Sequence, residues 1–127
     1  MQPQITYKST NLFDKDIKRL AKRFTSLFED LELAKKAAIE LFHIKRLDNR
    51  AVFPIPDFCS ETYKVCKIKK FACKSLKGRG VKSGIRVIYF FDIKKLEVTF
   101  LEMYFKSAQE NEDRERIKAL IKLLQPN

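Results

Sequence analysis

Two lysines and an arginine in a strongly basic, strand-forming part of the sequence could act on a phosphate group. Lys67 and Lys69 alternate with Cys66 and Ile68, so a β-strand would place the two lysines on one side, about 7 Å apart. Neighbouring ammonium groups lower each other's pKa, and a lysine that is deprotonated near neutral pH can act as a general base. Arg86 stays charged and suits the growing negative charge of a phosphate in a transition state. RNA cleavage by the 2′-hydroxyl also needs an acid, for which this part of the sequence offers no candidate.

The three residues belong to a continuous basic stretch. Between Thr62 and Phe91 the chain has nine cationic side chains and no acidic one, and they supply +9 of a formal net charge of +11. Apolar residues are interleaved with the cations, which indicates a fixed positive surface and favours nucleic acid as the ligand. The alternative is a solvated strand that binds phosphate without chemistry. The other cations expected to bind RNA are Lys64, Lys70, Lys74, Lys77, Arg79 and Lys82.

Several other classes of function are disfavoured. Cys59, Cys66 and Cys73 show no C-x-x-C spacing and His43 is the only histidine, so we expect neither a metal site nor a cofactor. The stretch Gly80–Ser83 ends like a nucleotide-binding P-loop but lacks its first glycine. No apolar run approaches the roughly 20 residues that span a bilayer, and the first residues do not form a signal peptide. We expect a cytoplasmic protein that does not bind membranes.

The first half of the chain predicts a strand followed by a helical hairpin. Residues 4–9 alternate like a short strand. Asn11 can cap a helix whose apolar residues recur every three or four positions, and a second helix follows a break near residues 25–30 and ends around Leu47. Residues 48–61 contain Pro54 and Pro56 and are expected to form an irregular connection.

The second half predicts an antiparallel meander and a last helix. Strands are expected over residues 62–71, 84–92 and 96–105, with a glycine-containing flexible loop at 74–83 and a tight turn at 92–95. A helix is expected from Asn111. The order β-α-α-β-β-β-α predicts one α+β domain over residues 1–127, with two N-terminal helices on one face of a small, mainly antiparallel sheet and the other face open for binding.

The sequence resembles a known family in this basic part of the chain. The segment Lys67-Ile68-Lys69, then Ser83-Gly84-Ile85-Arg86-Val87-Ile88-Tyr89, then Met103-Tyr104-Phe105-Lys106 is similar to the RelE/ParE toxin superfamily of bacterial type II toxin–antitoxin modules. The resemblance extends over roughly residues 5–124. It implies a RelE-like fold with a positively charged concave face.

The resemblance also implies an activity and partners. The RelE branch, which we favour, cleaves mRNA in the ribosome without a metal, whereas the ParE branch inhibits DNA gyrase; both are neutralised by a cognate antitoxin protein. Lys67, Lys69 and Arg86 match the family's catalytic positions, and Lys106 is the candidate for a further phosphate contact, with base stacking from Tyr104 or Phe105. The family's arginine after the position of Lys106 is Ser107 here, and no tyrosine follows Tyr104. These departures keep open a gyrase inhibitor or a non-catalytic RNA-binding protein.

Overall fold

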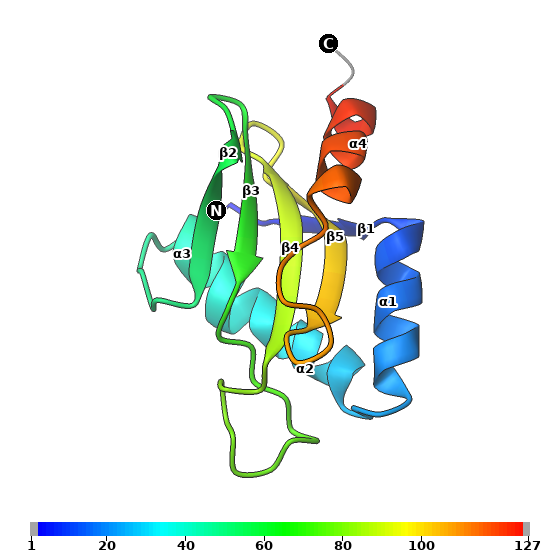
Figure 1. The fold of residues 1–127 in the computed structure, drawn as a ribbon. Coiled ribbons are helices and arrows are strands. Elements are labelled where there is room, and N and C mark those ends of the chain that lie inside the picture. The colour runs from blue at the N-terminus through cyan, green and yellow to red at the C-terminus, as the bar shows by residue number, and fades with distance from the viewer. Residues whose placement is uncertain (1–2, 126–127) are drawn as a thin grey trace.

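The protein is an α+β structure built on one five-stranded sheet. The computed structural model describes residues 3–125, and the strands follow the order β1-β5-β4-β3-β2 across the sheet (Figure 1). The elements are, in chain order, β1 (Thr6–Ser9), α1 (Asn11–Ala21), α2 (Leu27–Ala34), a π-helical segment η1 (Lys35–Glu40), α3 (Leu41–His43), β2 (Val52–Cys59), β3 (Tyr63–Ile68), β4 (Ile85–Asp92), β5 (Glu97–Phe105) and α4 (Arg114–Leu124).

The predicted fold class and most of the predicted elements are confirmed. The sheet is antiparallel from β2 to β5, and only β1 pairs with β5 in a parallel orientation. The first helix is capped by the Thr10 side chain, which accepts a hydrogen bond from the Phe13 amide, rather than by Asn11. The helical hairpin breaks at residues 22–26, slightly before the predicted break near residues 25–30, and its second arm ends at His43, before the predicted end at Leu47.

The expectation of an irregular connection over residues 48–61 is wrong, because Val52–Cys59 forms β2. Proline cannot donate to a sheet ladder, which disfavours it in a central strand but not in an edge strand. β2 is an edge strand, paired only with β3, and its register shifts between Pro54 and Cys59. The two prolines therefore marked an edge position and not a loop.

The helices of the N-terminal half cover one face of the sheet. Phe13, Ile17 and Leu27 from the helices form one buried cluster with Cys66 and Ile68 from β3. Figure 1 shows α2 behind the strands, and the connection from β5 to α4 in front of β4.

The second face is open only in part, whereas the sequence predicts a face that is open for binding. Ile117 and Leu120 of α4 pack on it, in a second buried cluster with Val65, Ile88 and Tyr104. The sheet is therefore covered on both sides, by the N-terminal helices on the first face and by α4 on part of the second. No helix of the described residues is long and apolar enough to cross a membrane.

Candidate nucleic-acid interface

The residues predicted to act on a phosphate lie on the second face of the sheet. Lys67 is opposite Ile88, and Arg86 is opposite Tyr104. Alternate residues of a strand share a face, so Arg86 and Lys67 are diagonal neighbours, with a separation of about 7–8 Å expected for such pairs. The predicted split of Lys67 from the buried Cys66 and Ile68 is confirmed.

Lys69 and Lys106 continue the same face beyond the ends of their strands. The Lys69 amide donates to the Ala51 carbonyl (2.8 Å), which continues the pairing of β3 with β2 beyond the strand ends. The Lys106 amide donates to the Gly84 carbonyl (2.9 Å), which continues the pairing of β5 with β4 in the same way. The Lys69 ammonium lies 4.6 Å from the ring centre of Phe53, the residue opposite Lys67. Both lysines are exposed and Arg86 is half-buried.

Lys67 is not the deprotonated base that the lysine spacing predicts. Its ammonium lies 2.6 Å from a carboxylate oxygen of Glu112, and its side chain is only 14% exposed. Burial lowers the pKa of Lys67, but the hydrogen bonds and charges of Glu112 and Tyr104 outweigh burial and raise the pKa. Lys67 is therefore a permanent cation at neutral pH, suited to holding a phosphate and unsuited to taking a proton.

Tyr104 does not offer a surface on which an RNA base could stack. It is 3% exposed and belongs to the cluster beneath α4. Burial raises the pKa of the Tyr104 phenol, against the lowering effect of Lys67, so the hydroxyl remains protonated. Phe105 points to the opposite face and contacts Phe24, with ring centres 5.0 Å apart. Neither ring is therefore exposed on the second face, where the sequence predicts that one of them stacks on a base.

The loop between β3 and β4 extends from one end of the sheet (Figure 1). It carries exposed cationic side chains. Gly78 and Gly80 both adopt positive φ, at 82° and 55°, in the tight path of this loop. The base of the loop is fixed, because the Ser75 amide donates to the Ser26 hydroxyl (2.9 Å) and the Ser83 hydroxyl donates to the Phe71 carbonyl. The exposed cations are Lys74, Lys77, Arg79 and Lys82, and the Lys74 ammonium pairs with Glu29 at 2.7 Å.

Two of the predicted RNA-binding lysines lie on the helix side, away from Lys67. Lys64 lines a hollow with His43 and Phe91, and Lys70 lines another with Leu33 and Val81. Lys64 lies an odd number of residues from Lys67 on β3, so strand alternation turns it to the other face. Lys70 lies beyond the end of β3, and its neighbours in the hollow place it on the helix side. The continuous basic stretch is therefore divided between two faces and a loop.

His43 has a structural position. Its Nε2 is 2.8 Å from the Tyr89 hydroxyl, and its ring stacks on Phe91 at 4.0 Å between centres. Burial, with a smaller effect of Lys64, lowers its pKa to about 4. A neutral histidine in this packing joins the end of the helical segment to β4 and is not placed to act on the second face.

Sequence reasoning missed the acidic residues that border the cations. Glu112 pairs with Lys67, and Glu102, which is 2% exposed, accepts hydrogen bonds from Gln109 (2.7 Å) and from the Asp113 amide (2.9 Å). One sequence signal could have indicated them. The short acidic segment at residues 110–113 contains the first acidic residues after β5, and the basic strands of this chain need negatively charged partners. Its position over β3 could not be read from the sequence.

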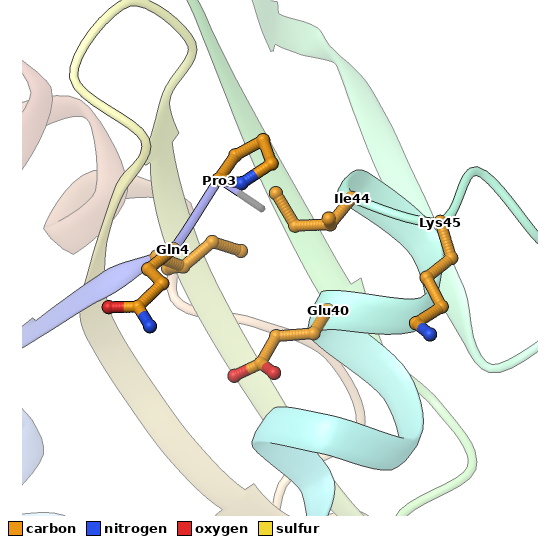
Figure 2. A pocket seen from close by; sticks show the side chains of 6 residues that line it. Pro3, Gln4, Glu40, Ile44 and Lys45 are labelled. Atoms are coloured by element: carbon orange, nitrogen blue, oxygen red, sulfur yellow. The ribbon is translucent and has the colours of Figure 1, made fainter. Parts of the chain in front are cut away.

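A further hollow, at the start of β1, offers no free acidic side chain. It lies between the start of β1 and the end of the helical segment, where Figure 2 shows Pro3 and Gln4 facing Glu40, Ile44 and Lys45. The acidic residue of this hollow, Glu40, already accepts a hydrogen bond of 2.8 Å from the Tyr7 hydroxyl. Within residues 3–125, no group of three or more histidine, cysteine, aspartate or glutamate residues is arranged to hold a metal ion.

The fold defined here is an α+β sheet with helices on both faces and a cationic patch on the second face. Among solved structures, the chain is similar to one described as the crystal structure of the archaeal RelE-RelB complex from Pyrococcus horikoshii OT3. The TM-score is 0.49 and the identity 12%, over 82% of this chain and 97% of that chain. No family model matches, and no match is found among curated proteins. At this identity, nothing about individual residues transfers from that structure to this chain.

Proposed function

We propose that this protein is the toxin of a type II toxin–antitoxin module and acts on mRNA in the ribosome as an endoribonuclease. The observation that carries the proposal is the convergence of Lys67, Lys69, Arg86 and Lys106 on one face of the sheet. These are the residues at which the sequence resembles the RelE/ParE superfamily. A cluster of cations on rigid strands holds a phosphate without reorganisation, which is how a developing negative charge is best stabilised.

In the proposed reaction Arg86 and Lys67 hold the scissile phosphate, and Lys69 and Lys106 hold its neighbours. Lys67 remains protonated, so its role is electrostatic. In the proposed step the 2′-oxygen attacks the phosphorus and the bond from phosphorus to the 5′-oxygen breaks. The ribosome or water takes the 2′ proton, and water supplies the proton to the leaving 5′-oxygen. Positioning alone can lower a barrier by several kcal/mol. A ribosome that orients the message therefore fits a site that is rich in cations and poor in bases.

A protein partner is part of this proposal. With a formal net charge of +11, the free protein would bind nucleic acid indiscriminately. We propose an antitoxin with an acidic segment and apolar anchors that covers the second face or displaces α4. Opposite charges would speed its association, and the association rate would fall as salt rises.

The test is induction of the protein in bacteria, followed by mapping of mRNA 5′ ends. New ends within translated messages support the proposal. They should disappear with Arg86→Gln and persist with Lys95→Gln, a matched control in the exposed turn between β4 and β5. Cleavage that is unchanged in Arg86→Gln would refute the assigned role of the second face.

The second candidate is a binder without catalysis, directed at RNA or at DNA gyrase. The raised pKa of Lys67 favours it, because the site then holds a permanent cation where a base was expected. Intact messages with halted replication after induction would identify gyrase as the target. Intact messages with ribosome-bound protein and normal replication would identify a non-catalytic RNA binder.

A further inference from the structure

The Lys67 ammonium forms an ion pair with the carboxylate of Glu112. The Oε1 atom of Glu112 lies 2.6 Å away, and the two side chains are 14% and 10% exposed, so the pair is largely shielded from water. The guanidinium of Arg114 lies 3.8 Å from the other oxygen of the same carboxylate. A carboxylate held between an ammonium and a guanidinium has the surroundings that a phosphate oxygen would have.

The segment that carries Glu112 is fixed in place over the second face. Glu102 accepts hydrogen bonds from Gln109 and from the Asp113 amide, and the Asp113 side chain caps α4 by accepting from the Arg116 amide (3.1 Å). Arg114 also reaches Asp57 on β2. These contacts define residues 109–114 as a strap that runs from β5 to α4, in front of β4 in Figure 1.

We propose that Lys67 and Arg114 form an anion subsite that Glu112 occupies as an internal stand-in for a substrate phosphate. This inference rests on the proposed function. An incoming RNA must replace the carboxylate of Glu112 to reach Lys67, whereas Lys69 and Lys106 are exposed and free to engage it first. Glu112 therefore weakens the binding of any single phosphate. The strap favours ligands that contact several of the cationic side chains at once.

Burial explains why the carboxylate resists displacement by solvent anions. A shielded ion pair cannot be broken by removing one member without leaving a buried, unpaired charge. The ligand that displaces Glu112 must bring its own negative charge to Lys67. Free phosphate also carries negative charge but has no other contact to hold it at Lys67, whereas a polyanion is anchored at the neighbouring exposed cations.

The direct test compares Glu112→Gln with Glu110→Gln, using a fluorescein-labelled single-stranded RNA dodecamer and fluorescence anisotropy. Both changes remove one negative charge, but Glu110 is exposed and lies outside the ion pair. We expect Glu112→Gln to bind about tenfold more tightly, the factor that corresponds to about 1.4 kcal/mol. Glu110→Gln should gain much less. Equal gains for the two variants would overturn the proposal.

A second readout does not depend on RNA. Acetic anhydride acetylates free amines, so mass spectrometry of digests reports the accessibility of Lys67 relative to Lys69. We expect Lys67 to be several-fold less reactive than Lys69 in the wild type and to approach it in Glu112→Gln. Thermal unfolding of the variant verifies that the fold is kept.

The two readouts separate failure of this inference from failure of the proposed function. Unchanged reactivity of Lys67 in a folded Glu112→Gln variant would refute the occupied subsite. Increased reactivity with no RNA binding by any form would uphold the subsite and refute RNA as the ligand. The double variant Glu112→Gln/Lys67→Met should bind RNA no more tightly than Lys67→Met alone. Tighter binding by the double variant would show that Lys67 is not the source of the gain in affinity.

Discussion

The Arg116 guanidinium lies 2.6 Å from the Asp16 carboxylate and joins the last helix to the first. The same carboxylate accepts the Met103 amide of β5 (3.1 Å), and Arg116 also donates to the Leu101 carbonyl (3.1 Å). β1 pairs with β5 only as far as Phe100. Asp16 and Arg116 therefore satisfy backbone groups on the part of the β5 edge that has no neighbouring strand.

Replacement of Asp16 should destabilise the protein strongly. The Asp16 side chain is 4% exposed and that of Arg116 is 17% exposed. Asp16→Ala therefore leaves the largely buried Arg116 cation without a counter-charge, with only the Leu101 carbonyl as its partner, and leaves the Met103 amide without its acceptor. We expect a loss of about 3 kcal/mol in the free energy of unfolding, measured by urea denaturation. The exposed Glu61→Gln should change stability by less than about 0.5 kcal/mol. A similar small change for Asp16→Ala would show that the link is not a stabilising one.

Gly84 should be less tolerant of alanine than Gly78. Both have φ near +80°, at 83° and 82°, but a Cβ at Gly84 would lie 3.1 Å from Cε1 of Phe105, whereas nothing lies within 4 Å at Gly78. The backbone strain of alanine at positive φ is common to both, at about 1–2 kcal/mol. We expect Gly84→Ala to lose about 1–2 kcal/mol more than Gly78→Ala because Phe105 must shift against Phe24. Equal losses in denaturant unfolding would mean that Phe105 moves at no cost.

The protein should lose stability as the pH falls from about 6.5 to 4 because of His43. Burial holds the pKa of His43 at about 4 in the folded protein, against 6.5 for a solvent-exposed histidine side chain. In this window the unfolded chain binds a proton that the folded protein does not, so acid favours unfolding. Urea denaturation at pH 7 and pH 5 should show a smaller loss for His43→Gln than for the wild type. An identical loss of stability in the two proteins would show that a group other than His43 takes up the proton.

The loop cations should contribute to RNA affinity through a salt-dependent term. Arg79 is exposed on the glycine-containing loop that leads into β4, the strand of Arg86. Arg79→Gln should reduce the slope of log affinity against log salt by about 0.7, the value for one phosphate contact to a single strand. Anisotropy titrations at several salt concentrations measure the slope, with Lys95→Gln as the control. A slope unchanged from wild type would place the loop outside the interface.

Much of the fold could be read from local patterns, because those patterns record which side of an element is buried. The alternation around Lys67 placed Cys66 and Ile68 in the core and the lysine on the second face, as the structure confirms. Helical periodicity placed the two arms of the hairpin and their break. The prolines of β2 misled because their cost depends on whether a strand lies at an edge, and only the strand order decides that.

The site depended on contacts that local sequence does not encode. The alternating pattern determined that Lys67 and Lys69 share a face, and composition determined that the chain is strongly basic. Tertiary packing decided that α4 covers part of that face, that Tyr104 is buried and that Glu112 lies on Lys67. The pKa of a lysine depends on the charges and burial that the fold brings to it. The sequence therefore determined which residues are cationic, and the tertiary structure decided that Lys67 is a paired, permanent cation.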